Sequence, residues 1–176
     1  VLTDVAPKNV EFWQGCALFS DFVADGVMDF ALLDILSEGP IQLIESEKVL
    51  SKETLTTPII ALANYLFDSI PSDLFCIDKG KLYEKLTHVA SPRENIDQGQ
   101  IKEPSRLEVS FRRRVCEKGD YYQDPSLNDI LSFYKENASK GNIPFPIGSL
   151  QAIKNLQKLF AMVRWRILTK CVGQEH

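Results

Sequence analysis

Three short apolar stretches in the first part of the chain each stop at a polar side chain. Residues 59–63 are an unbroken apolar run, which is typical of a strand that is covered on both faces, as in a parallel sheet. The pattern therefore predicts three strands whose carboxyl ends are marked by polar residues. The stretches are residues 1–3, 28–33 and 59–63, and the residues that follow them are Asp4, Asp34 and Asn64.

Between the first two of these strands, the apolar residues recur at helical spacing. The helix predicted there is capped by Asn9, starts at Val10 and ends at Gly26. Between the second and third strands, residues 41–44 and 48–50 are short apolar pieces that form either an excursion or a small hairpin. The order strand, helix, strand, excursion, strand is typical of one half of a doubly wound sheet.

The pattern then changes to one that favours antiparallel strands. Residues 72–86 predict two strands joined at Gly80, because glycine supplies the positive φ that a tight hairpin needs. Residues 91–105 are polar and predict a loop, and residues 107–116 alternate in part and predict another strand. We therefore expect residues 74–115 to form a β-rich insertion.

The last part of the chain predicts two helices and a strand. Ser126 is a candidate cap for the first helix. Residues 142–146 are expected to interrupt regular secondary structure before the second helix. Ser149 is a candidate cap for the second helix, which runs to about Met162 and carries one apolar stripe. Residues 164–169 predict the final strand. The whole pattern predicts an α/β fold in a single domain: a Rossmann-like, doubly wound, mostly parallel sheet with a β-rich insertion.

The composition and the absence of certain motifs exclude several functional classes. The net charge of −4 gives no reason to expect nucleic acid or an anionic membrane surface as a partner. No apolar run reaches the length of about 18 residues that a membrane-spanning helix needs. The sequence contains no nucleophile-elbow motif and no phosphate-binding P-loop, which disfavours hydrolases and nucleotide triphosphatases.

The cysteines are far apart in the sequence and form no Cys/His cluster, so neither a zinc site nor a redox dithiol is expected. Isolated thiols are typical of proteins in a reducing compartment, which predicts a cytoplasmic location. With only His88 and His176 present, histidine-based catalysis has little support. The cysteines are Cys16, Cys76, Cys116 and Cys171.

Acidic residues after two strands, and a distinctive segment after the third, carry a resemblance to a known family. Residues 64–71 read Asn-Tyr-Leu-Phe-Asp-Ser-Ile-Pro, which is similar to the Asn-Glu-Phe-x-Asp-Ala-Leu-Pro element of the MidA-like methyltransferases. With Asp4 and Asp34, the segment resembles a class I S-adenosylmethionine-dependent methyltransferase that is entered at its second strand. The resemblance implies S-adenosylmethionine as the cofactor and methyl donor.

The resemblance also implies a role for individual residues. Asp4 would accept hydrogen bonds from the ribose hydroxyls, which suits a carboxylate because both of its oxygens are acceptors. Asp34 would face the adenine amino group, and Asn64 would lie beside the methionine end. These three residues are expected to finish neighbouring parallel strands and to face a common cleft. The residues expected to shape the acceptor site are Tyr65, Asp68 and Pro71.

Two departures from the family pattern leave an alternative open. The chain lacks the glycine-rich turn that follows the first strand in the family, and it opens at Val1 inside an expected strand, so we expect a piece of a longer chain. Tyr65 stands where the MidA-like proteins have Glu. The sequence therefore supports two hypotheses: a methyltransferase with an unknown acceptor, which could be a protein side chain, or a non-catalytic binding or scaffold module.

Several of these residues also have a purely structural interpretation. Asp4 and Asp34 could be solvated strand ends, and Asn64 and Asp68 could form a turn and cap a helix. The run from Arg112 to Arg114 invites a nucleic-acid or phosphate-binding interpretation. A solvated sheet edge explains it better, because neighbouring residues on a strand point to opposite faces. The adjacent pair Tyr121 and Tyr122 is expected to pack a loop on the core.

Overall fold

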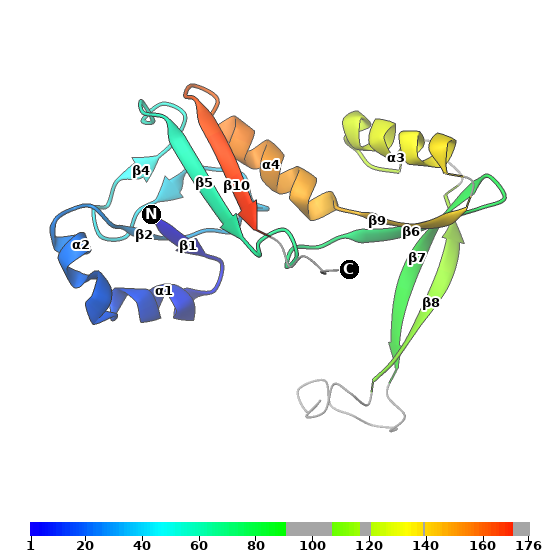
Figure 1. Cartoon of the computed structure of the whole chain (residues 1–176), viewed down its shortest axis with the longest axis horizontal. Helices are drawn as coiled ribbons and strands as arrows, with labels where there is room; N and C mark the ends of the chain where they lie inside the picture. Colours follow the sequence, from blue (N-terminus) through cyan, green and yellow to red (C-terminus); the bar gives the residue numbers. More distant parts are fainter. Residues whose placement is uncertain (91–106, 117–120, 139, 171–176) are drawn as a thin grey trace. The chain divides into compact units, whose positions relative to one another are not determined.

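A computed structural model shows a chain divided into two compact units (Figure 1). The first unit consists of Val1–Pro71 and Gly148–His176, and the second of Ser72–Ile147. The second unit is therefore an insertion in the sequence of the first, and it contains the residues of the expected β-rich insertion. The structure describes residues 1–90, 107–116, 121–138 and 140–170.

Two parallel strand pairs and one small antiparallel hairpin make up the described strands of the first unit. Strand β1 pairs with β2 and β5 pairs with β10, both in parallel, while β3 and β4 form the hairpin. The elements are β1 (Leu2–Asp4), α1 (Pro7–Gln14), the 3-10 helix η1 (Ala17–Phe19), α2 (Ser20–Ala24), β2 (Phe30–Leu32), β3 (Ile41–Gln42), β4 (Val49–Leu50), β5 (Ile59–Asn64), α4 (Ile147–Leu159) and β10 (Trp165–Lys170).

The core of the first unit forms where β2 and the hairpin meet α4. Ala31 of β2 is fully buried with Ile41 and Leu43, and Leu159 of α4 packs against this cluster. Phe30 is also fully buried. These contacts confirm that residues 41–44 and 48–50 form a small hairpin, which was one of the two forms expected for them.

The prediction of a doubly wound, mostly parallel sheet is wrong. The two parallel pairs belong to separate two-stranded sheets, and the largest sheet is four-stranded and antiparallel. The chain between β2 and β5 folds as the β3–β4 hairpin, whereas a doubly wound sheet places a helical crossover between parallel neighbours. In the described part of the chain, β5 therefore does not join the β1–β2 pair.

The apolar run that predicted β5 forms a strand, but the expectation that both of its faces are covered is wrong. The side chains of Ile60 and Leu62 are 67% and 75% exposed. On β10, Leu168 lies opposite Leu62 and is 57% exposed. Only the other face of the pair is packed, with Ala63 buried and Trp165 in contact with Phe160 at a ring separation of 5.8 Å.

The helix predicted from Val10 to Gly26 is broken into shorter pieces. It starts earlier, at Pro7, since proline at the first helical position has a suitable φ and needs no hydrogen-bond acceptor for its nitrogen. Asn9 consequently lies inside α1 and does not cap it. Gly15 ends α1 as its C-cap residue, and Gly26 has a φ of +68° after α2.

The second unit is built on the four-stranded sheet in the order β8-β7-β6-β9, with every pair antiparallel. The expected hairpin is confirmed: β6 and β7 are joined at Lys79 and Gly80, whose φ angles of +50° and +72° are typical of a tight hairpin turn. The elements are β6 (Asp73–Asp78), β7 (Lys81–Ala90), β8 (Glu108–Val115), α3 (Pro125–Asn137) and β9 (Gly141–Phe145).

One face of this sheet carries the aromatic core of the second unit. Phe75 and Phe145 are fully buried and meet edge to face at 6.0 Å. Tyr121 and Tyr122 pack against Phe75 at 5.1 and 6.4 Å, which confirms the expectation that this pair packs a loop on the core. Tyr122 also donates a hydrogen bond of 2.6 Å to Asp73.

Three further predictions in this unit have different outcomes. The prediction that residues 142–146 interrupt regular secondary structure is wrong, because β9 occupies most of this segment. Pro144 is tolerated there since β9 is an edge strand. The cap of α3 is Asp124 and not Ser126, whose amide donates to the Asp124 carboxylate. The loop expected at residues 91–105 lies outside the described residues.

Candidate functional site

Asp4 and Asp34 lie at the same end of one parallel strand pair. Asp4 is the last residue of β1 and is in register with Leu32, the last residue of β2. The Leu33 amide donates a hydrogen bond of 2.9 Å to the Asp4 carbonyl, and Asp34 follows directly. The expectation that Asp4, Asp34 and Asn64 finish neighbouring parallel strands is therefore confirmed for the first two of these residues.

The Asp4 carboxylate is held in its ionised form by local donors. Its Oδ1 accepts a hydrogen bond of 2.8 Å from the Ala6 amide, and its Oδ2 accepts one of 2.9 Å from the Asn9 side chain. The Ala6 bond, followed by the Asn9 bond, lowers the pKa of Asp4 below its ordinary value. A carboxylate has about four acceptor positions, so further donors can still bind to both oxygens.

Asp34 organises the turn that follows β2. Its Oδ1 accepts a bond of 2.9 Å from the Leu36 amide, and its Oδ2 accepts one of 2.9 Å from the Ser37 hydroxyl. The buried side chain of Asn155 on α4 donates a bond of 2.9 Å to the Ile35 carbonyl within this turn. The turn at the end of β2 is thus fixed both by its own carboxylate and by a neighbouring helix.

A groove of about 650 Å³ begins immediately after this turn. Its volume lies within the range of about 300–1,000 Å³ that is usual for sites of small molecules. Three segments of the first unit form it: the end of the Asp34 turn, the chain after β4, and the last turns of α4. The lining residues are Glu38, Gly39, Pro40, Ser51, Lys52, Glu53, Asn155, Lys158, Leu159 and Ala161.

The groove carries paired charges of both signs. Lys158 on α4 donates a hydrogen bond of 2.6 Å to Glu38, and Lys52 lies 3.6 Å from Glu53. All four side chains are more than half exposed. Exposed ion pairs contribute only about 0–1 kcal/mol, so these groups can exchange their present partners for charged groups of a ligand.

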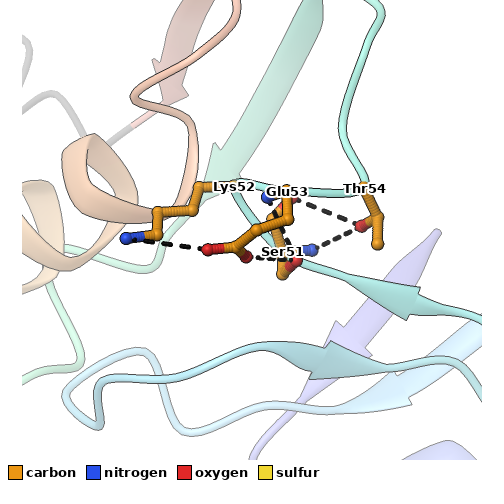
Figure 2. Close-up of polar contacts among 4 residues, drawn as sticks. All are labelled: Ser51, Lys52, Glu53 and Thr54. Carbon is orange, nitrogen blue, oxygen red and sulfur yellow. Dashed lines mark hydrogen bonds and ion pairs between the residues drawn. The ribbon is translucent and has the colours of Figure 1, made fainter.

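The Glu53 carboxylate, in the segment after β4, belongs to a local hydrogen-bond network (Figure 2). The Ser51 hydroxyl donates a bond of 2.7 Å to Glu53, and this bond is the main reason why the pKa of Glu53 is lowered. The Ser51 amide donates a bond of 2.9 Å to the Thr54 hydroxyl. This rim of the groove therefore carries an ionised carboxylate that is hydrogen-bonded to its own segment.

The residues expected at the methionine end and at the acceptor site lie at the end of β5 and in the chain that follows it. Asn64 is the last residue of β5 and is in register with Lys170 of β10. Asp68 is exposed, and the Pro71 carbonyl accepts a bond of 3.0 Å from the Gly148 amide. The expectation that Asn64 finishes a strand next to those of Asp4 and Asp34 is therefore wrong, because β5 pairs with β10 in a separate sheet; the residues up to Pro71 follow β5 in the chain.

Tyr65 has an unusual backbone conformation directly after β5. Its φ of +54° lies in the left-handed region, which is rare for a bulky residue and costs about 1 kcal/mol or more. The conformation is maintained on both sides: the Tyr65 amide donates to the Lys170 carbonyl at 2.9 Å, and the Ser69 hydroxyl donates to the Tyr65 carbonyl at 2.9 Å. Strained residues of this kind are concentrated at functional sites.

Sequence reasoning missed two polar residues that support the site. Asn155 is buried on the apolar stripe that predicted α4, and Asp29 is buried just before β2. The strand predicted at residues 28–33 includes Asp29, and a lone carboxylate inside an apolar run is a signal for a buried acid with dedicated donors. Asn155 donates to the Ile35 carbonyl in the Asp34 turn, whereas Asp29 accepts hydrogen bonds from the amides of Glu45 and Ser46 in the loop of the β3–β4 hairpin.

Comparison of the chain with protein-family models, curated proteins and solved structures finds no match. Within the described ranges, no helix is both long and apolar enough to cross a membrane. Within the same ranges, no group of three or more His, Cys, Asp or Glu side chains is arranged to hold a metal ion. Functional inference therefore depends on the side chains at the β1–β2 end and in the groove.

Proposed function

We propose that the first unit binds S-adenosylmethionine at the carboxyl end of β1 and β2 and acts as a methyltransferase-like protein. The acceptor is unknown, and a protein side chain is one class that the resemblance allows. A single observation carries the proposal: two carboxylates finish a register-paired parallel strand pair, and a groove of ligand size starts at the turn that one of them organises.

The chemistry of the donor set fits the proposed ligand. Asp4 is ionised and keeps acceptor capacity for a pair of ribose hydroxyls. Asp34 offers an exposed carboxylate to an amino group, and the groove offers both ammonium and carboxylate groups to a zwitterion. When bound, S-adenosylmethionine supplies a methyl group on a sulfonium sulfur.

A second candidate function is a binding or scaffold module without methyl transfer. It is favoured by the fact that the carboxylates of Asp4 and Asp34 already accept local hydrogen bonds. It is also favoured by the separate position of Asn64, which the resemblance assigns to the methionine end. In this alternative the same groove binds a ligand, and no acceptor is required.

Calorimetric titration of S-adenosylhomocysteine and S-adenosylmethionine into the protein tests the proposal. We expect both compounds to bind at one site. Replacement of Asp34 by alanine should weaken binding by about 1.5–3 kcal/mol, because a hydrogen bond to a charged group is lost. Asp25→Ala is the matched control, since Asp25 is an exposed acid at the end of α2.

The outcomes separate the two candidates. Absence of binding heat together with an unchanged melting temperature would contradict the methyltransferase proposal. Binding without any methyl transfer to peptides that carry lysine, arginine and glutamine side chains would favour the binding module. An equal affinity for the wild-type protein and the Asp34→Ala variant would remove Asp34 from the site.

A further inference from the structure

Among the described residues, strand β8 has one edge without a strand partner, and its side chains are exposed. It is the first strand of the four-stranded sheet and, among the described strands, pairs only with β7 (Figure 1). All eight of its residues are exposed. The outer edge of such a strand presents a row of free backbone donors and acceptors, which is a template for another strand.

The side chains of β8 are amphipathic in a way that a purely solvated edge does not require. Residues 109, 111, 113 and 115 share one face of the sheet because side chains alternate along a strand. Val109 is 58% exposed, Phe111 is 50% exposed and Val115 is 48% exposed. Arg113 interrupts this apolar row. Solvated edge strands are usually protected by charged side chains, so the exposed aromatic and aliphatic groups of the row are not explained by solvation alone.

The same face carries an unfavourable pair of like charges. Lys85 of β7 lies directly opposite Arg113 of β8, and like charges in this position are destabilising. Within the described residues, the ion-pair partner of Arg113 is Asp78 at 3.5 Å, and both side chains are more than one third exposed. Lys85 instead lies 4.6 Å above the Phe111 ring and donates to Asn142 at 3.3 Å. An additional anionic group on this face would therefore offset the repulsion between Lys85 and Arg113.

The opposite face of β8 also carries positive charge at alternate positions. Arg114 pairs with the buried carboxylate of Glu84, with an Nε to oxygen distance of 2.7 Å. Arg112 lies opposite Leu86 on the same face and is exposed. A strand added beside β8 would therefore meet arginine side chains at three consecutive positions.

We propose that β8 binds an extended acidic peptide segment of a partner protein by strand addition. In such a complex the peptide backbone pairs with the free edge of β8. Acidic residues lie opposite Arg112, Arg113 and Arg114. Apolar residues lie opposite Phe111 and the two exposed valines of β8. The surface thus selects acidic residues in the middle of an amphipathic strand. This inference concerns the second unit and does not depend on cofactor binding by the first.

A peptide is favoured over single-stranded nucleic acid by the described chemistry. Nucleic-acid platforms present several aromatic side chains for stacking, whereas β8 presents Phe111 alone. The unpaired backbone edge is complementary to a peptide and not to a sugar-phosphate chain. Nucleic acid is therefore an outcome of the test and not the proposal.

Fluorescence anisotropy with a labelled probe peptide tests the inference on the full chain. The probe is Val-Glu-Glu-Glu-Val-Ser-Val, whose residues run antiparallel to β8 with the valines facing its apolar row. Controls are the same peptide with lysine in place of each glutamate, and a short oligothymidylate. We expect saturable binding of the acidic probe and none of the lysine peptide.

Charge reversal in the protein locates the binding surface. Arg113→Glu should weaken binding of the acidic probe by about tenfold or more, because like charges would then face each other. Arg166→Glu is the matched control, since Arg166 is also exposed on a strand, β10 of the first unit. Circular dichroism spectra that match the wild type show that both variants are folded.

Two N-methylated probes test strand addition itself. Methylation of one alternate set of amides blocks one edge of the peptide and methylation of the other set blocks the opposite edge, so only one of the two should lose binding. Equal binding of both methylated probes would overturn the proposal. So would no binding of the acidic probe, binding unaffected by Arg113→Glu, or tighter binding of oligothymidylate that Arg113→Glu abolishes.

Discussion

The carboxylate of Asp29 connects β2 to the loop of the β3–β4 hairpin. It accepts hydrogen bonds of 2.7, 2.9 and 3.1 Å from the amides of Phe30, Glu45 and Ser46. The side chain is 8% exposed, so each donor would be left unsatisfied if the carboxylate were lost. A single residue therefore holds the hairpin that helps to form the core of the first unit.

The pKa of Asp29 gives a prediction for stability. Burial tends to raise this pKa, but the bonds from the Ser46 hydroxyl and from the three amides outweigh burial and lower the pKa from 3.8 to about 2. A carboxyl group whose pKa is lowered by folding stabilises the folded state at pH values above the pKa that the group has in the unfolded chain. For Asp29 this stabilisation is about 2 kcal/mol at neutral pH. Asp29→Asn should lose at least about this much in chemical denaturation at pH 7.

The lowered pKa of Asp29 also predicts how the stability of the protein changes with pH. The contribution of Asp29 is complete above the unfolded pKa and is lost as the pH falls from about 5 towards 2. The stability of the wild type should therefore approach that of Asp29→Asn over this range. The exposed Asp25→Asn variant is the control and should follow the wild type. A constant difference between wild type and Asp29→Asn from pH 7 to pH 2 would contradict this assignment.

At the scale of elements, the start of α4 is fixed by a close backbone contact. Gly148 is buried, and its amide donates a bond of 3.0 Å to the Pro71 carbonyl. A Cβ atom at this position would lie 2.7 Å from the Pro71 carbonyl oxygen and 3.2 Å from the Pro71 nitrogen. Because both neighbours are backbone atoms, neither can move aside by a change of rotamer.

Gly148→Ala should therefore destabilise the protein by about 1–3 kcal/mol, which is the usual cost of forcing extra atoms into a packed site. Denaturant unfolding measures the loss. Gly15→Ala is the matched control, because its Cβ would meet atoms no closer than 3.6 Å; its stability should change by no more than about 0.5 kcal/mol. Equal effects of the two substitutions would show that the contact with Pro71 does not constrain the glycine.

Most individual strands could be predicted from the sequence because their signals are local. The apolar run before Asn64 and the turn at Gly80 were sufficient to find β5 and the β6–β7 hairpin. The segment at residues 142–146 misled the prediction since it contains proline, yet its place at a sheet edge allows that residue in a strand. An edge position is a property of the assembled sheet and leaves no local signal.

At the scale of the whole molecule, pairing between distant segments could not be predicted. Residue 59 pairs with residue 165, although all residues of the second unit come between them in the sequence. The sequence did not show that β5 would join this partner and not the β1–β2 pair. The pattern located Asp4 and Asp34, because each follows its own apolar run. It could not locate the groove that begins after the Asp34 turn, because three separate segments build this groove.

Hydrogen exchange measured by mass spectrometry, with and without S-adenosylhomocysteine, tests the central claim most directly. If the ligand binds at the carboxyl end of β1 and β2, exchange should slow in peptides that cover residues 3–9 and 33–42. The exposed strand β8 should be unaffected. Absence of slowing in both segments at saturating ligand, or slowing confined to residues 72–147, would contradict the account.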